Sequence, residues 1–154
     1  GNVKIVLDVY VEEWSPTNAY QIMKEYLQLS AYDVPDVILT SYDGLAYAAR
    51  QALDEAGITQ EVIITGQDAE PKAIKYILKG KQSLTIYKPL KPLAENAVIT
   101  AVKLAKGEKP DTTTSIFNNR KMVPALLFEP IPVDKNNIRE TVVKDGMISE
   151  AELN

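Results

Sequence analysis

Two charged side chains stand where they could act on a ligand together. Asp68 follows the apolar run EVIITG (61–66), and Lys88 ends the next apolar run, SLTIYK (83–88). Such a pair can supply a base with a partner, two ligand contacts, or only a helix cap at Asp68. The sequence contains no histidine and no cysteine, and no serine motif stands beside the pair. A catalytic set cannot be completed, so we predict no enzymatic activity and leave ligand binding and capping open.

Four further candidates lie at turns or near helix starts. Trp14, the single tryptophan, either lies half-buried at the rim of the core or offers a flat face to a sugar ring. Asp43 is expected as a helix cap whose second oxygen can accept a proton from a hydroxyl group. Tyr42 either reaches the same space or packs. For Asn18, one turn into a helix, the pattern favours a solvated side chain over a ligand contact.

These residue types suit a neutral ligand that carries several hydroxyl groups. Carboxylates accept hydroxyl protons in charge-assisted hydrogen bonds, while ammonium and amide groups donate. Phosphate is not expected, because the sequence has no glycine-rich loop, Walker A motif or GxGxxG motif. Asp43 and Asp68 alone would leave a metal ion under-coordinated. We therefore expect neither a metal nor a cofactor.

Alternating strands and helices are expected to position these side chains. Apolar and β-branched runs predict strands at 2–11, 35–41, 61–66 and 83–88. Helices are expected between them, at 15–30, 42–57 and 68–80. Ser15 as the N-cap with Pro16 after it marks the start of the first helix, and Gly57 and Gly80 mark the ends of the other two.

This alternation predicts an α/β fold of flavodoxin-like type, a parallel sheet with helices on both faces. The ligand crevice of such a sheet lies at the carboxyl ends of its strands, where the candidate residues fall. After Lys88 the pattern changes. One long helix is expected over 92–106, then a proline-rich extended stretch to about residue 133, then a short helix and a tail.

Composition limits the classes of partner. The 154 residues are 45% hydrophobic and carry a net charge of −4, with the lysines scattered. An acidic chain without a basic patch is not expected to bind nucleic acid. No apolar run approaches the roughly 20 residues of a membrane span. The opening GNVKIVLDVYVEEW lacks the basic and apolar regions of a signal peptide.

Several stretches resemble the periplasmic D-xylose-binding proteins, the sugar receptors of ABC transport systems. They are TGQDAEPKAIKYILKGKQSLTIYKPLKPLAENA, VPALLFEPIPVDKNNIRETVVKDGMISEAEL and, around the tryptophan, VLDVYVEEWSPTNAYQIM. The resemblance runs from about Val3 to Leu153. It implies a periplasmic type I receptor whose two lobes close on a sugar. It also implies that Trp14 stacks on the sugar, that Asp68 accepts its hydroxyl protons, and that Lys88 contacts a hydroxyl group at the hinge.

The chain departs from this family in two ways. Tyr42 replaces the sugar-contacting asparagine of the SND loop, and YDGL is similar to receptors for multiple aldoses, so the ligand is expected to be xylose or a related aldopyranose. The chain is also shorter than such receptors. It is expected to be a fragment, with 1–87 and 123–154 as the C-terminal lobe and 88–122 as a crossover that completes the absent N-terminal lobe.

The resemblance and the fragment together imply partners. The expected partner is an ABC permease or, alternatively, a membrane sensor histidine kinase to which related receptors present sugar. The helix at 92–106 would expose its apolar stripe, so a homodimer or domain-swapped assembly is expected. Half of a sugar site should bind weakly or undetectably on its own.

Overall fold

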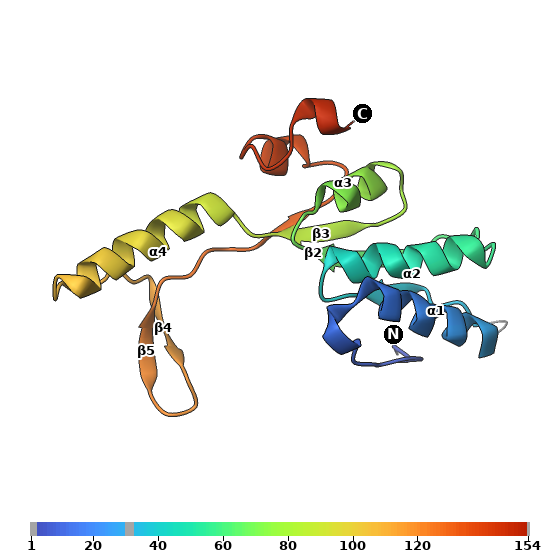
Figure 1. The fold of residues 1–154 in the computed structure, drawn as a ribbon, viewed down its shortest axis with the longest axis horizontal. Coiled ribbons are helices and arrows are strands. Elements are labelled where there is room, and N and C mark those ends of the chain that lie inside the picture. The colour runs from blue at the N-terminus through green and yellow to red at the C-terminus, as the bar shows by residue number, and fades with distance from the viewer. Residues whose placement is uncertain (1–2, 30–32, 154) are drawn as a thin grey trace. The chain divides into compact units, whose positions relative to one another are not determined.

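The structure, a computed structural model, describes residues 3–29 and 33–153. Contacts divide the chain into two units, one formed by 1–87 with 132–154 and the other by 88–131. Figure 1 labels most of their helices and strands. The expected crossover ended at residue 122. The second unit extends further because a hairpin strand that begins at Met122 pairs with the strand before it.

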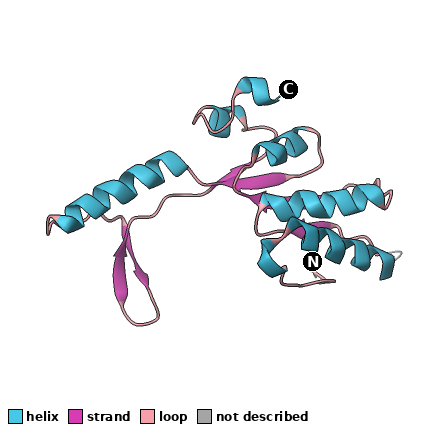
Figure 2. Ribbon diagram, in the orientation of Figure 1, coloured by secondary structure: helices cyan, strands magenta, loops and turns pink. Residues whose placement is uncertain are grey.

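The first unit contains a four-stranded sheet in the order β1-β2-β3-β6, coloured magenta in Figure 2. β1, β2 and β3 pair in parallel. The strands are β1 (Val37–Leu39), β2 (Ile63–Gln67), β3 (Leu84–Tyr87) and β6 (Ile131–Val133). The helices that flank them are α1 (Pro16–Leu29), α2 (Asp43–Glu55) and α3 (Pro71–Leu78). The predicted α/β fold with a mostly parallel sheet is confirmed.

Local signals in the sequence set the helix ends. The hydroxyl oxygen of Ser15 accepts the N–H of Asn18 at 3.4 Å, and α1 begins at Pro16, as predicted. Gly57 and Gly80 follow the C-caps of α2 and α3 with φ of 71° and 69°. Glycine adopts this left-handed conformation without a Cβ clash, so both helices end where their glycines predict.

The core beside the first loops comes from α1, α2 and β2. The buried face of α2 is rich in alanine, which lets α1 approach closely. Met23 of α1, Leu53 of α2 and Ile64 of β2 pack in one cluster, and Leu53 and Ile64 are fully buried. Close packing of this kind gives the adjoining loops a rigid base.

The strand predicted at 2–11 is wrong for the described part of that stretch. Residues 3–11 form no strand, and Val3 and Ile5 are 91% and 75% exposed. A β-branched composition favours an extended chain, but strand formation also needs a partner edge and a packing surface. The fourth strand of the sheet is instead β6, from the stretch predicted only as extended.

The second unit consists of one helix and one hairpin. α4 (Leu90–Ala105) begins two residues before the predicted start and contains no buried residue. β4 (Thr114–Phe117) pairs with β5 (Met122–Ala125) in antiparallel register, so the proline-rich stretch is extended as predicted. The chain returns to the first unit and closes with two short helical segments, η2 (Arg139–Val143) and η3 (Glu150–Leu153).

Candidate functional site

Trp14 ends a short helical turn, η1 (Glu12–Trp14), just before α1. Glu13 and Trp14 both have left-handed backbone conformations, with φ of 56° and 52°. Such a conformation costs on the order of 1 kcal/mol or more in residues other than glycine, and persists only where the surroundings hold it. Trp14 is 50% exposed. The turn therefore presents Trp14 as an aromatic surface rather than burying it in the core.

Tyr42, from the loop between β1 and α2, holds this turn. Its ring stacks on the indole of Trp14, with 5.7 Å between ring centroids and 27° between ring planes. Its hydroxyl donates a hydrogen bond of 2.9 Å to the backbone carbonyl of Trp14. Burial, followed by the charge of Glu70, raises the pKa of Tyr42, which keeps the hydroxyl protonated and able to donate. The ring and the hydroxyl group of Tyr42 therefore both contact Trp14.

Asn18 supports the same turn with a hydrogen bond from its side chain. Its side-chain amide donates to the backbone carbonyl of Glu12 at 3.1 Å. The carbonyl of Glu12 also accepts the N–H of Ser15 at 3.2 Å. The sequence favoured a solvated side chain at Asn18, with a ligand contact as the alternative. In the structure its amide group ties the start of η1 to the first turn of α1.

Asp68 lies on the turn that follows β2. Its N–H donates to the carbonyl of Ile86 at 2.9 Å, which carries the pairing with β3 one residue beyond β2. Asp68 and Ala69 have left-handed backbones, with φ of 94° and 55°. The N-cap position of α3 is Glu70. Capping, one of the two roles left open for Asp68, would need Asp68 at this position, and the strained turn places it two residues earlier.

Asp43 is fully buried and joins the first two loops of the sheet. One carboxylate oxygen accepts the side-chain amide of Gln82 at 2.9 Å. The other accepts the hydroxyl of Thr85 at 3.0 Å and the backbone N–H of Glu70 at 2.8 Å. The hydroxyl oxygen of Thr85 in turn accepts the N–H of Ala69 at 3.1 Å. The two backbone amides that follow Asp68 are thus held by one buried network.

The burial of Asp43 differs from the sequence expectation. Asp43 is the first residue of α2 and Tyr42 is its N-cap residue, so the predicted cap position is wrong by one residue. Burial raises the pKa of Asp43, and hydrogen bonds from Glu70, Gln82 and Thr85 oppose this rise. Its two oxygens hold neighbouring elements together, which is a different role from the predicted contact with a ligand hydroxyl.

The sequence reasoning did not single out the partners of Asp43. Gln82 and Thr85 are buried polar residues, and Thr85 lies between Leu84 and Ile86 in β3. Gly66 completes the arrangement, since a Cβ there would lie 2.1 Å from the carboxylate of Asp43. Two signals in the sequence could have indicated this network, namely a polar residue in a buried strand and a glycine in a strand.

Direct contacts place three loops next to one another at the carboxyl ends of β1 and β2. Trp14 stacks on Tyr42, and the side-chain amide of Gln67 donates to the carbonyl of Ser41 at 3.1 Å. Asp68 lies on the turn that Gln67 begins. This edge of the sheet thus brings an exposed aromatic ring and a partly exposed carboxylate onto neighbouring loops.

Lys88 directly follows Tyr87, the last residue of β3, and is the first residue of the second unit. It is partly buried. Lys88 was a candidate because it was expected at the carboxyl end of a strand, and the structure places it there. Its contact with a ligand stays a prediction.

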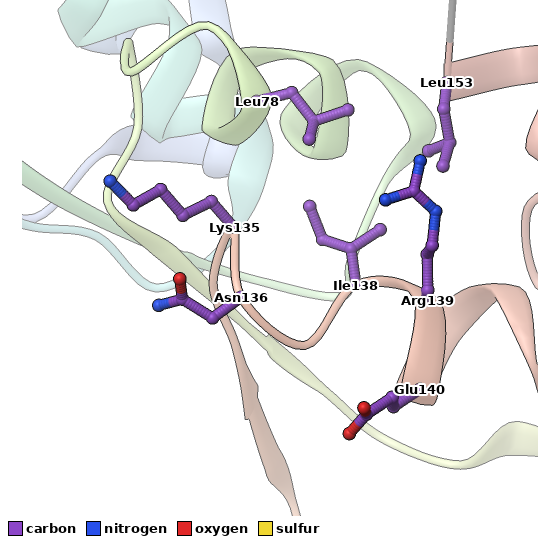
Figure 3. A pocket seen from close by; sticks show the side chains of 7 residues that line it. All are labelled: Leu78, Lys135, Asn136, Ile138, Arg139, Glu140 and Leu153. Carbon is purple, nitrogen blue, oxygen red and sulfur yellow. The ribbon is translucent and has the colours of Figure 1, made fainter.

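A pocket lies at the other end of α3. Figure 3 shows it between the last turn of α3 and the C-terminal segment. Its two cationic side chains, Lys135 and Arg139, point away from each other in that view, and Arg139 pairs with Glu150 at 3.0 Å. The pocket is lined by Leu78, Lys135, Asn136, Ile138, Arg139, Glu140 and Leu153. Its charges do not converge on one ligand.

Residues 3–29 and 33–153 show neither a metal-binding cluster nor a membrane-spanning helix. No group of three or more acidic, histidine or cysteine side chains in this part of the chain is placed to hold a metal ion. None of the helices described there is long and apolar enough to cross a membrane.

Comparisons with known proteins identify the family of the chain. Residues 1–109 match the family described as periplasmic binding protein domain. The chain is 42% identical over 153 residues to the D-xylose-binding periplasmic protein of Escherichia coli, covering 99% of this chain and 46% of that protein. It is 44% identical over 146 residues to the protein of the same name from Haemophilus influenzae, covering 95% and 44%.

A solved structure shows the same fold. The carbohydrate transporter solute-binding protein of Chloroflexus aurantiacus, in complex with D-glucose, superposes with a TM-score of 0.82 at 29% identity. The match covers 90% of this chain and 42% of that one. The chain spans about half the length of the curated relatives it matches.

Proposed function

The chain belongs to the periplasmic binding protein family, and we propose that it forms the sugar-contacting part of a receptor that delivers xylose or a related aldopyranose to an ABC transporter. One observation supports this most directly. Trp14 is held half-exposed, on a strained turn, beside loops that carry Asp68 at the carboxyl edge of the sheet. An aromatic face with a nearby carboxylate is suited to a pyranose, which has apolar C–H faces and a hydroxyl rim.

Each proposed contact has its own chemistry. The exposed face of Trp14 stacks against the C–H face of the sugar. The carboxylate of Asp68 accepts protons from sugar hydroxyl groups in charge-assisted hydrogen bonds. Lys88, after β3, donates to a hydroxyl group. No bond is made or broken in this scheme, and the chain offers neither histidine nor cysteine for such a step.

We further propose that the chain carries only part of the sugar site and acts in the periplasm. It spans about half the length of its D-xylose-binding relatives. A receptor that encloses its sugar between two lobes desolvates hydrogen bonds on both sides of the ring. With one side present, the affinity of the chain alone falls by several kcal/mol.

Nuclear magnetic resonance tests the sugar site even at weak affinity. The indole N–H of Trp14 gives a single signal because the chain has one tryptophan. D-xylose, D-glucose or L-arabinose should shift this signal and the amide signals of Asp68 and Ala69 in a saturable way. Glycerol, an open-chain polyol, serves as the ligand control, and Trp14→Ala as the protein control. The absence of saturable shifts with every sugar, up to its solubility, would contradict the proposal.

Calorimetry tests whether the chain carries only part of the sugar site. D-xylose is titrated into the chain alone and into an equimolar mixture with the complementary part of the Escherichia coli relative. Binding that strengthens in the mixture supports the division of the site between two parts. Submicromolar binding by the chain alone would refute it.

A further inference from the structure

We propose that Tyr42 is a positioning residue, which sets the face that Trp14 presents to the sugar and donates no hydrogen bond to the sugar itself. The inference rests on the proposed sugar binding at Trp14. It selects between the two roles that the sequence left open for Tyr42, reaching the ligand or packing.

The first support is the double attachment of Trp14 to Tyr42. The stacked rings fix the plane of the indole, and the 2.9 Å hydrogen bond to the carbonyl of Trp14 fixes the backbone that carries it. Tyr42 is 28 residues away in sequence, so this contact ties the turn to the loop before α2. A left-handed turn at Glu13 and Trp14 needs such external support.

The second support is the use of the Tyr42 hydroxyl. A phenol has one proton to donate, and the carbonyl of Trp14 accepts it. Donation to a sugar would break this bond and release the strained turn. The aromatic ring covers part of the indole on one side, and the exposed half of Trp14 remains for the ligand.

The third support is Gly44, on which the ring of Tyr42 rests. A Cβ at Gly44 would lie 2.3 Å from ring atoms of Tyr42 and from its hydroxyl oxygen. The phenol ring thus packs closely over a residue without a side chain while it stacks on the indole of Trp14. The absence of a side chain at Gly44 allows Tyr42 to reach Trp14.

Two variants test how the hydrogen bond of Tyr42 and the position of its ring each hold Trp14. Tyr42→Phe keeps the ring and removes the hydrogen bond. Gly44→Ala keeps Tyr42 intact and displaces its ring, which can move because the crowded atoms belong to the end of a side chain. Tyr26→Phe is the matched control, since the hydroxyl of Tyr26 also donates to a backbone carbonyl, that of Asp33, at 2.7 Å.

The first readout needs no sugar. Fluorescence excited beyond the tyrosine band reports on Trp14 alone, because it is the single tryptophan. Tyr42→Phe and Gly44→Ala should both increase acrylamide quenching of Trp14 and lower its fluorescence anisotropy, while Tyr26→Phe changes neither. Circular dichroism confirms that each variant is folded. Unchanged quenching and anisotropy in both folded variants would overturn the positioning role.

The second readout is sugar affinity, measured from the shift of the Trp14 indole signal. Tyr42→Phe should weaken binding by about two- to tenfold, the range of one net hydrogen bond. A loss of affinity in Tyr42→Phe with unchanged quenching and anisotropy would mean that the hydroxyl contacts the sugar, and would also overturn the proposal. If the wild-type chain binds no sugar, the proposed function fails, whereas the quenching experiment still decides the positioning role.

Discussion

The carboxylate of Asp43, at the start of α2, accepts the backbone N–H of Glu70, at the start of α3, across 2.8 Å. One buried side chain thereby joins two helix starts whose loops lie at the candidate sugar site. Three donors from two segments meet on this carboxylate, namely Gln82, Thr85 and the amide of Glu70. A carboxylate can accept all three because both of its oxygens carry only acceptor sites.

Asp43→Asn should lower the free energy of unfolding by about 1–3 kcal/mol. The side chain of asparagine carries an NH2 donor where Asp43 has an acceptor oxygen. At least one group that now donates to Asp43 would therefore face another donor, at a fully buried site. Urea denaturation measures the change, with Asp36→Asn at an exposed position as the control. Equal stability of the two variants would show that the network does not need the charge of Asp43.

Gly66→Ala should be more destabilising than Gly44→Ala, although both add one methyl group. The Cβ at position 66 would meet the carboxylate of Asp43 at 2.1 Å and the amide of Gln82 at 2.8 Å, and both groups are held inside the core. At position 44 it meets the end of the Tyr42 side chain, which can move. Overpacking costs about 1–3 kcal/mol where the neighbours cannot shift. Thermal melting of the two variants gives the order, and the reverse order would contradict the packing at Gly66.

Much of the fold follows from local signals. Ser15 and Pro16 start α1, and Gly57 and Gly80 end α2 and α3, because each acts through its own backbone preference. The stretch 2–11 shows the limit of such signals. Its composition favours a strand, yet pairing depends on a distant edge that composition does not reveal.

The sequence predicts which loops form the candidate site, but it does not predict what each side chain does there. Topology places Trp14, Tyr42 and Asp68 at the carboxyl edge of a parallel sheet. Whether a polar group there faces a ligand or a neighbour depends on which partners the fold brings within hydrogen-bonding distance. The side chains of Tyr42 and Asp43 meet groups 28 and 27 residues away, and sequence spacing does not predict such pairs.

Alkaline pH should destabilise the first unit through Tyr47. Burial, then the charge of Glu70 and the hydrogen bond to it, raise the pKa of Tyr47 from 10.0 to about 12. The folded chain therefore holds this proton more tightly than the unfolded chain. The stabilisation is complete below pH 10 and is lost as pH rises from 10 toward 12. Urea denaturation across this range should show a steeper fall in stability for the wild type than for Tyr47→Phe, and equal slopes would contradict the raised pKa.

The exposed apolar side of α4 should drive self-association of the chain. Val98 is 65% exposed, and Val102, one turn later, is also exposed, so they form a continuous stripe with no buried member. Apolar surface of this kind gains free energy when a second copy covers it. Light scattering should give a mass above that of the monomer, and Val98→Glu should shift it toward the monomer. Thr59→Glu, which adds the same charge at an exposed position of the first unit, should leave the mass unchanged. A monomeric wild-type chain at every concentration would show that this stripe does not bind another copy.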